Sequence, residues 1–477
     1  MAEENEGAEA DARPSRMATD HSPSMTTGRG RTFGHPTGLI PLAGTELWER
    51  ISFHGMVALL TLYLAEQLLL PGHIEKVVGF PVFRKVIEGV TGPLSIQPLA
   101  AQIFGIYIGF IYFTPIFGGL VGDRLIGRRN AVMLGAVLMT CGHLAMAFDQ
   151  SFLLALLLLI LGAGFLRGNL IAQVGRLYAS GDPRQAAGMQ IYVAAVNTGA
   201  FIAPIVTGLL AQTWGWHVGF GFAGFGMMIG LGTYFIGSKY IPTDPPRREI
   251  RETQPLTSAE WRTIAFLIAL LPALTLYWVI NTQEWNVYNI WTRDHVNMVI
   301  YGWRMPIAWI QSLNAIACVI LVPPILALWK WQLRTGRGFS DMGKLAFGCA
   351  TMAAFTFLDG AASVIFGAQS KIPLTWVVMD NFGEAFAYLW VVPVAIAFYT
   401  RTAPKQVNAM MLGVYYLSTF AGSLISGRLG GLYDSISPLA FWSLHAGLVA
   451  LAGAIFAGLA WPGVAGKFAP MSVSKSV

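Results

Sequence analysis

Runs of about 20 apolar residues recur along almost the whole chain, and this feature limits the fold more than any other. Each run is long enough to cross roughly 30 Å of hydrocarbon as a helix that rises 1.5 Å per residue. Stretches such as "FLLALLLLILGAGF" at 152–165 lack the alternation of a membrane β-strand. Since 55% of the 477 residues are hydrophobic and only 12% are charged, the sequence predicts an all-α membrane protein.

Turn and charge signals divide the apolar sequence into about twelve predicted transmembrane helices. A long basic connection at 238–261, expected to be a cytoplasmic linker, separates the first six from the last six. We therefore expect two six-helix bundles at 41–237 and 262–463, a disordered cytoplasmic tail at 1–40 and a short cytoplasmic tail at 464–477. The helices are predicted near 46–70, 98–120, 129–148, 151–174, 186–212, 215–237, 262–290, 305–330, 343–367, 372–400, 406–430 and 437–462.

Arginine and lysine gather in alternate connections between the predicted helices. Under the positive-inside rule, these connections and both termini face the cytoplasm of a multi-pass plasma membrane protein, which in a bacterium is the inner membrane. The same loops account for the net charge of +6, so no nucleic-acid partner is needed. The cysteines Cys141, Cys318 and Cys349 show neither paired nor metal-ligand spacing, and we expect them in apolar packing.

Glu46, Glu49 and Arg50 form a charged group at the start of the first predicted helix. Their spacing places all three on one helix face. A charged group within a span normally faces the bundle interior and marks an ion or substrate route, whereas a group at a helix start can also lie at the membrane surface. Arg167, deep in the fourth apolar segment, is the cation predicted to share these acids. A carboxylate that exchanges cationic neighbours between conformations suits proton coupling.

The loop "GGLVGDRLIGRRNA" at 118–131, after the second predicted helix, carries closely spaced glycines, an acid and arginines. An ordinary basic loop is one interpretation. The loop also resembles the signature of the major facilitator superfamily, which implies a major facilitator fold. In that interpretation the cytoplasmic gate motif consists of Gly119, Asp123, Arg124 and Arg128, with Gly127 and Arg129 beside it.

Several motifs in the right chain order resemble the proton-coupled oligopeptide transporter family, a branch of that superfamily, from about residue 40 to 460. The first-helix motif is matched at Glu46, Glu49, Arg50, Ser52 and Gly55, and the fourth-helix motif at Gly162, Gly164, Leu166 and Asn169. The resemblance implies that Glu46, Glu49 and Arg50 couple protons. It implies substrate contacts from His54, Arg167, Asn197, Gln283, Asn314, Glu384, Tyr388 and Tyr415.

The chain departs from the family pattern where the family binds the two ends of a peptide. Val57 stands in place of an arginine, and Tyr388 in place of a glutamate. Glu384 lies one turn before Tyr388 on the same face, so it is either a displaced substrate acid or a structural pair. Thr282 replaces an acid of the seventh helix. Glu284, about 200° further round an unbroken helix, is expected to face the opposite side.

These observations predict a proton-coupled symporter that imports peptides or peptide-like solutes by alternating access. Two alternatives stay open: a modified peptide or peptide-derived metallophore as the solute, and a membrane sensor that binds without transport. The expected partners are a small peptide, protons and membrane lipid, and the protein is expected to be a monomer. No nucleophile elbow, phosphate loop or zinc-ligand spacing occurs in the sequence, so we expect no enzyme activity and no cofactor or metal.

Overall fold

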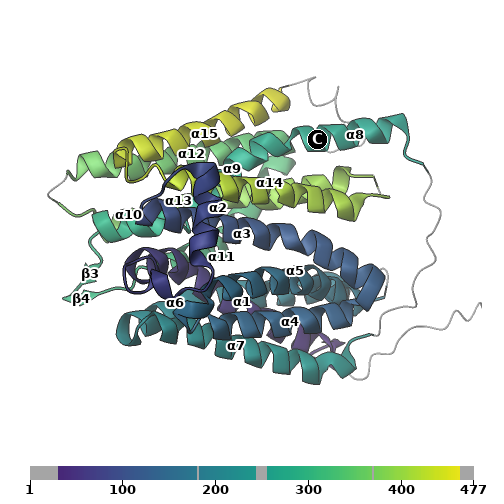
Figure 1. The fold of residues 1–477 in the computed structure, drawn as a ribbon. Helices are drawn as coiled ribbons and strands as arrows, with labels where there is room; N and C mark the ends of the chain where they lie inside the picture. Colours follow the sequence, from purple (N-terminus) through teal and green to yellow (C-terminus); the bar gives the residue numbers. More distant parts are fainter. Residues whose placement is uncertain (1–30, 180–181, 243–254, 368–369, 405, 462–477) are drawn as a thin grey trace, which may run out of the picture.

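The computed structural model consists mainly of long helices that run side by side (Figure 1). It describes residues 31–179, 182–242, 255–367, 370–404 and 406–461. Two short β-hairpins pair β1 (Arg31–Thr32) with β2 (His35–Pro36) and β3 (Val299–Ile300) with β4 (Trp303–Arg304). The helices are α1 (Leu39–Tyr63), α2 (Phe80–Thr91), α3 (Ile96–Val121), α4 (Arg128–Ala145), α5 (Phe152–Arg176), α6 (Arg184–Trp214), α7 (Trp216–Gly237), α8 (Ser258–Ala269), α9 (Leu271–Gln283), α10 (Val287–His295), α11 (Trp309–Arg334), α12 (Asp341–Ile365), α13 (Leu374–Thr402), α14 (Asn408–Gly430) and α15 (Pro438–Ala460).

Within the described ranges, 11 helical segments are long and apolar enough to cross a membrane. One of them is α8 and α9 taken together, Ser258–Gln283. The remaining long helix is α4, which has 18 residues, begins with two arginines and packs against α5 and α7. With α4 the set reaches the expected twelve, and the prediction of an all-α, multi-pass membrane protein is confirmed.

The long helices form two bundles of six spans. In the first, α1 packs against α6 and α7, and α5 packs against α3 and α4. In the second, α12 packs against α13 and α15, and α9 packs against α14 and α15. Figure 1 shows the first bundle in purple to teal below the second in green to yellow. Half of the predicted linker, residues 243–254, and all of residues 1–30 and 462–477 lie outside the described residues.

Residues 31–40, which were expected to belong to a disordered tail, form the β1–β2 hairpin and the first residues of α1. They are held by contacts to later parts of the first bundle: His35 Nδ1 lies 2.9 Å from the Tyr178 hydroxyl, and Arg184 donates to the Gly34 carbonyl at 3.1 Å. Because α1 begins at Leu39 and not near residue 46, the predicted charged group lies inside the helix and not at its start.

The two bundles meet along α3 and α14, which approach each other through glycines. A Cβ on Gly105 would lie 2.5 Å from the carbonyl oxygen of Ser423 and 2.7 Å from the Cα of Gly427. A Cβ on Gly427 would lie 3.0 Å from the carbonyl oxygen of Ala101. A side chain at Gly105 would therefore collide with the backbone of α14, and one at Gly427 would be crowded by the backbone of α3, so the two backbones themselves are in contact. Small residues allow such close packing between membrane helices.

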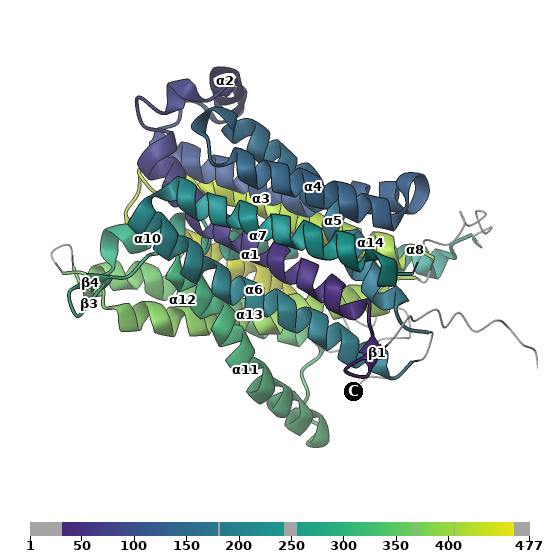
Figure 2. The same cartoon turned by 90° about the horizontal axis from the view of Figure 1, so that it is seen from below.

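A second junction joins α6 to the first turns of α11. Trp309 Nε1 donates to the Ile205 carbonyl at 2.9 Å, and Ser312 donates to the Phe201 carbonyl at 2.8 Å. Figure 2 shows α11 leaving the other helices as it runs away from the β3–β4 hairpin towards the end where α8 lies. The bundles are therefore joined at the end of the molecule that carries this hairpin.

Polar contacts across the bundles lie at the same end. Thr61 on α1 donates to the side-chain oxygen of Asn286 at 3.3 Å, and Gln212 on α6 donates to the Arg304 carbonyl at 2.8 Å. Arg293 on α10 forms an ion pair with Glu66 at 3.3 Å. We call these three contacts the hairpin-end contacts.

Candidate functional site

The buried charges of the first bundle form a single group on α1 and α5. Arg50 Nε lies 2.8 Å from Glu46 Oε1 and 2.6 Å from Glu49 Oε2, so the arginine bridges both acids. Arg167 Nε, on α5, donates to Glu49 Oε1 at 3.1 Å. Glu49 is 0% exposed and Glu46 is 4% exposed. These four residues, Glu46, Glu49, Arg50 and Arg167, are called the α1–α5 charge group below.

The group is therefore enclosed in protein, as the bundle-interior interpretation predicted. Two acids and two arginines balance in charge, which is what permits such a group inside a membrane domain. Tyr192 on α6 adds a hydroxyl that donates to Glu46 Oε2. Sequence reasoning missed Tyr192, because a tyrosine in an apolar helix carries no signal of which acid it faces.

Arg167 keeps part of its guanidinium free of protein acceptors. Its central carbon lies 4.1 Å from the centre of the Phe53 ring, a cation–π arrangement. Among the described residues, its buried Nη2 has no hydrogen-bond partner. The side chain therefore has one nitrogen on Glu49 and another that still lacks an acceptor.

In the second bundle, Glu284 and Asn314 face each other. Asn314 on α11 donates its amide to Glu284 Oε1, and Asn281 donates to Oε2 at 3.4 Å. The sequence analysis expected Glu284 to face away from Thr282, and the two side chains do contact different helices. The Thr282 hydroxyl lies 3.2 Å from that of Ser423 on α14, whereas Glu284 pairs with Asn314 on α11.

Aromatic side chains lie between the charged groups of the two bundles. Tyr112 on α3 stacks on Tyr416 on α14, with ring centres 6.1 Å apart. Tyr416 also lies within electrostatic range of Arg50 and Arg167. His54 on α1 packs edge-on against Trp285 of the second bundle at 5.3 Å. Neither Tyr112 nor Tyr416 was predicted, because ordinary aromatic packing has the same sequence pattern.

The remaining predicted substrate residues are dispersed. Gln283 is fully buried, where its amide donates to the Ser426 carbonyl at 2.8 Å and lies 3.1 Å from His445 Nε2. Tyr415 is also fully buried, against Tyr399. Tyr388 is half-buried on α13, and Asn197 is exposed on α6. The structure thus does not bring Gln283 and Tyr415 to the α1–α5 charge group.

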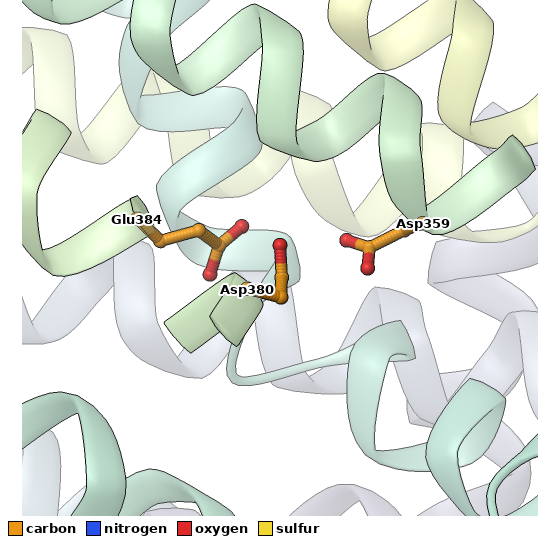
Figure 3. A group of neighbouring side chains, drawn as sticks. All are labelled: Asp359, Asp380 and Glu384. Carbon is orange, nitrogen blue, oxygen red and sulfur yellow. The ribbon is translucent and has the colours of Figure 1, made fainter. Parts of the chain in front are cut away.

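Glu384 lies among other acids. Figure 3 shows its carboxylate beside those of Asp380, on the same helix, and Asp359, on α12. One carboxylate oxygen from each of these three residues lies within 4.8 Å of the other two. The analysis of the sequence missed Asp359 and Asp380, although an acid inside an apolar run is itself a signal of function.

Two residues of the predicted cytoplasmic gate motif, Asp123 and Arg128, pair with each other just after the end of α3. Arg128 Nε lies 2.6 Å from Asp123 Oδ1, whereas Arg124 is exposed. Gly119 has open space around it, but a Cβ on its neighbour Gly118 would lie 2.0 Å from the Gly164 carbonyl oxygen. The loop is therefore braced by one ion pair, next to a very close approach of α3 and α5.

Comparisons with known proteins agree with this architecture. The sequence pattern of a family described as the POT family matches residues 129–255 and 253–442. A crystal structure of a peptide transporter POT in complex with sulfate superimposes with a TM-score of 0.78 at 25% identity, and the match covers 91% of this chain and 96% of that one. The predicted major facilitator fold of two six-helix bundles is confirmed.

Two transporters match in sequence over most of their length. The peptide transporter YePEPT of Yersinia enterocolitica subsp. palearctica is 25% identical, and the match covers 86% of this chain and 90% of the relative. A di-/tripeptide transporter of Lactococcus lactis subsp. cremoris is also 25% identical, and the match covers 86% of this chain and 92% of that relative.

Proposed function

The chain belongs to the POT family, and from this membership we propose that it imports peptides or peptide-like solutes together with protons. The proteins that it matches are transporters and not enzymes, so the expectation of no enzyme activity is confirmed. The same matches do not favour the sensor alternative. Peptide transport by the relatives in Yersinia and Lactococcus supports the proposed class of solute.

The observation that carries the proposal is the position of Glu49 between two arginines on different helices. Arg50 and Arg167 both contact its carboxylate, at 2.6 Å and 3.1 Å. If a substrate carboxylate draws Arg167 away, Glu49 loses one of its two positive neighbours. A carboxylate that loses a positive neighbour binds a proton more readily. Substrate binding and protonation are then linked, which is the requirement for a symporter.

Arg167 is the proposed receptor for the acidic end of the substrate. A guanidinium can form two parallel hydrogen bonds with a carboxylate, and its buried Nη2 lacks an acceptor. Residue 57, one helical turn after Phe53, is a valine and not a second arginine. Binding of the acidic end of the substrate therefore depends on Arg167. We assign the backbone amides of the substrate to Asn197 and Asn314, and its amino end to the acids Glu284 and Glu384.

We further propose that both termini face the cytoplasm and that the described conformation is open to that side. The basic connections lie at the end of the bundles opposite to the β3–β4 hairpin, where α8 lies in Figure 1. The bundles are joined at the hairpin end, and α11 diverges towards the basic end (Figure 2). This arrangement suits an alternating-access carrier in the plasma membrane.

Uptake by the purified protein in liposomes tests the proposal. We expect labelled dipeptide to accumulate under an inward proton gradient. Glu49→Gln should abolish this accumulation but keep the exchange of labelled for unlabelled peptide, which needs no net proton movement. Arg167→Ala should lose both activities, because it removes the receptor for the acidic end. Arg84→Ala, which opens a partly exposed ion pair with Glu88 on α2, is the matched control and should behave as the native protein.

Two results would contradict parts of this proposal. Folded native protein that neither accumulates nor exchanges any of a panel of di- and tripeptides would contradict peptide transport and direct attention to modified peptides. Accumulation by Glu49→Gln at the native level would exclude Glu49 as the coupling acid.

A further inference from the structure

Three acids from two helices converge inside the second bundle. Asp380 and Glu384 are one turn apart on α13, so they share a face. Asp359 comes from α12 and points towards them (Figure 3). One oxygen of each carboxylate lies within 4.8 Å of the other two. We call Asp359, Asp380 and Glu384 the acid triad.

The triad is buried and carries more hydrogen-bonding capacity than the protein uses. Asp359, Asp380 and Glu384 are 0%, 1% and 4% exposed. In the part of the chain that the structure describes, Asp359 has no partner for either oxygen, and one oxygen of Asp380 and one of Glu384 also lack partners. No arginine, lysine or histidine among these described residues forms an ion pair with the triad. Unpaired carboxylates at this depth are very costly to keep charged.

Asp359 makes this more than a pair of acids on one helix. It belongs to α12, it is fully buried, and its wholly unpartnered carboxylate is aimed at the acids of α13. No helical periodicity requires it to be there. Two separate helices therefore direct oxygen atoms with unused lone pairs towards one position.

Neutral oxygens without partners occur beside the triad as well. Asn381, between the two acids of α13 in sequence, is 1% exposed and its Oδ1 has no partner. Its amide lies 3.5 Å from the Tyr288 hydroxyl, which in turn donates to Asp380 Oδ2 at 2.8 Å. Thr356, one helical turn before Asp359, is also fully buried with an unpartnered hydroxyl. Carboxylate, amide and hydroxyl oxygens are the ligands of hard cations.

We propose that the acid triad is a binding site for a hard inorganic cation of about the size of Ca²⁺. Oxygen ligands surround Ca²⁺ at about 2.3–2.6 Å, so two ligands on opposite sides are about 4.6–5.2 Å apart. The triad oxygens all lie within 4.8 Å of one another, so they are close enough to share one such ion. Mg²⁺ usually keeps several waters and takes one or two carboxylates, so three buried carboxylates suit Ca²⁺ better. Histidine and cysteine are absent from the triad, which disfavours zinc and copper.

The bound cation would link α12 to α13. It would supply the positive charge that three ionised carboxylates at one buried position lack, and its binding would release the protons that they carry in its absence. The site lies in the second bundle, whereas the proposed coupling acids lie in the first, so cation binding does not depend on the proposed peptide transport. Glu384 is common to both proposals, so the binding test is done without peptide.

Direct binding to the purified, full-length protein is the test. The protein is treated with a chelator in choline chloride at neutral pH, and radiolabelled Ca²⁺ or Na⁺ is added. Ca²⁺ is the expected ligand, and Na⁺, which has a similar size, is the competing arm. Asp359→Asn and Asp380→Asn should each weaken binding about tenfold or more, because each removes a charged ligand. Asp341→Asn is the control, because Asp341 lies in the first turn of α12, pairs with Arg401 and is not part of the triad. Its binding of Ca²⁺ should equal that of the native protein.

Thermal unfolding supplies a second readout that does not require the variants to bind. Without added cation, Asp380→Asn should be more stable than the native protein, since it removes a buried carboxylate that has no counter-charge. Ca²⁺ should raise the Tm of the native protein more than that of Asp380→Asn at every concentration, because the variant binds the ion more weakly. If the protein binds Na⁺ saturably but does not bind Ca²⁺, the triad is a cation site and its ion is Na⁺. If native protein binds neither ion and its Tm responds only to protons, the proposal is wrong and the triad is a buried store of protons.

Discussion

Arg167 on α5 donates to Glu49 on α1 at 3.1 Å, and the same carboxylate lies 2.6 Å from Arg50 on its own helix. Arg50 and Glu49 are neighbours on one helix, so they stay within reach of each other whatever the other helices do. Arg167 comes from α5, so its contact with Glu49 depends on how α1 and α5 are placed relative to each other.

Replacing Arg167 by lysine should weaken substrate binding more than coupling. A lysine has a single charged nitrogen, so it cannot contact Glu49, cover the Phe53 ring and offer a second donor at once. We expect KM for dipeptide uptake to rise about tenfold, which corresponds to about 1.4 kcal/mol. Initial uptake rates in liposomes measure it. An unchanged KM would exclude a direct role for the guanidinium.

Tyr192→Phe should destabilise the charged form of the α1–α5 charge group. The Tyr192 hydroxyl donates to Glu46, which is 4% exposed and has no access to bulk water to replace that bond. Loss of one buried donor costs about 1–3 kcal/mol. The expected result is a lower Tm and a slower gradient-driven uptake. Tyr301→Phe, at a residue fully exposed in the β3–β4 turn, is the control. Equal Tm values for both variants would contradict the assignment.

The neighbouring glycines of α3 should respond oppositely to alanine. A Cβ at Gly118 would lie 2.0 Å from the Gly164 carbonyl oxygen, and that atom belongs to the backbone and cannot turn away. At Gly119 no atom lies within 4 Å. Gly118→Ala should cost about 1–3 kcal/mol or more through overpacking, whereas Gly119→Ala should be neutral or slightly stabilising. Thermal unfolding of both variants in one detergent gives the comparison.

Removing the hairpin-end ion pair should favour opening at that end. Arg293 contacts Glu66 across the bundles at 3.3 Å, but it also contacts Asp294 on its own helix at 2.7 Å. Both side chains of the cross-bundle pair are partly exposed, so the pair contributes at most about 1 kcal/mol. Arg293→Ala should therefore shift the ratio of the two conformations by about fivefold at most. Spin-label distances between the bundles measure this ratio. A shift of more than fivefold would mean that Arg293 makes further stabilising contacts across the bundles besides the one with Glu66.

Gln283→Leu should change stability without changing affinity. Its amide donates to the Ser426 carbonyl and contacts His445, both inside the second bundle. The substitution leaves a buried carbonyl without its donor, which costs about 1–3 kcal/mol. Tm should fall while KM for dipeptide stays at the native value. A raised KM in a protein of native stability would restore Gln283 as a substrate contact, as the family resemblance implied.

Sequence reasoning succeeded where a pattern depends on one helix at a time. Apolar length gave the spans, and i, i+3, i+4 spacing placed Glu46, Glu49 and Arg50 on one face. The same geometry separated Thr282, which meets Ser423 on α14, from Glu284, which meets Asn314 on α11. Sequence reasoning missed pairings between helices, such as Tyr192 with Glu46 and Asp359 with Asp380, because no spacing within one helix encodes which residue of another helix it meets.

The glycine contact between α3 and α14 has a consequence for how the two bundles move. At Gly105 and Gly427 the bundles touch through main-chain atoms. Beside them, the Ala101 carbonyl accepts a neutral hydrogen bond from Asn286 of the second bundle at 3.2 Å. Because neither contact involves an ionisable group, the resistance to relative rotation there should be nearly independent of pH and ionic strength. Any pH dependence of the transport rate must then originate elsewhere in the molecule. Gly105→Ala, which adds one methyl group at this contact, should therefore slow the relative movement of the bundles equally at every pH and salt concentration.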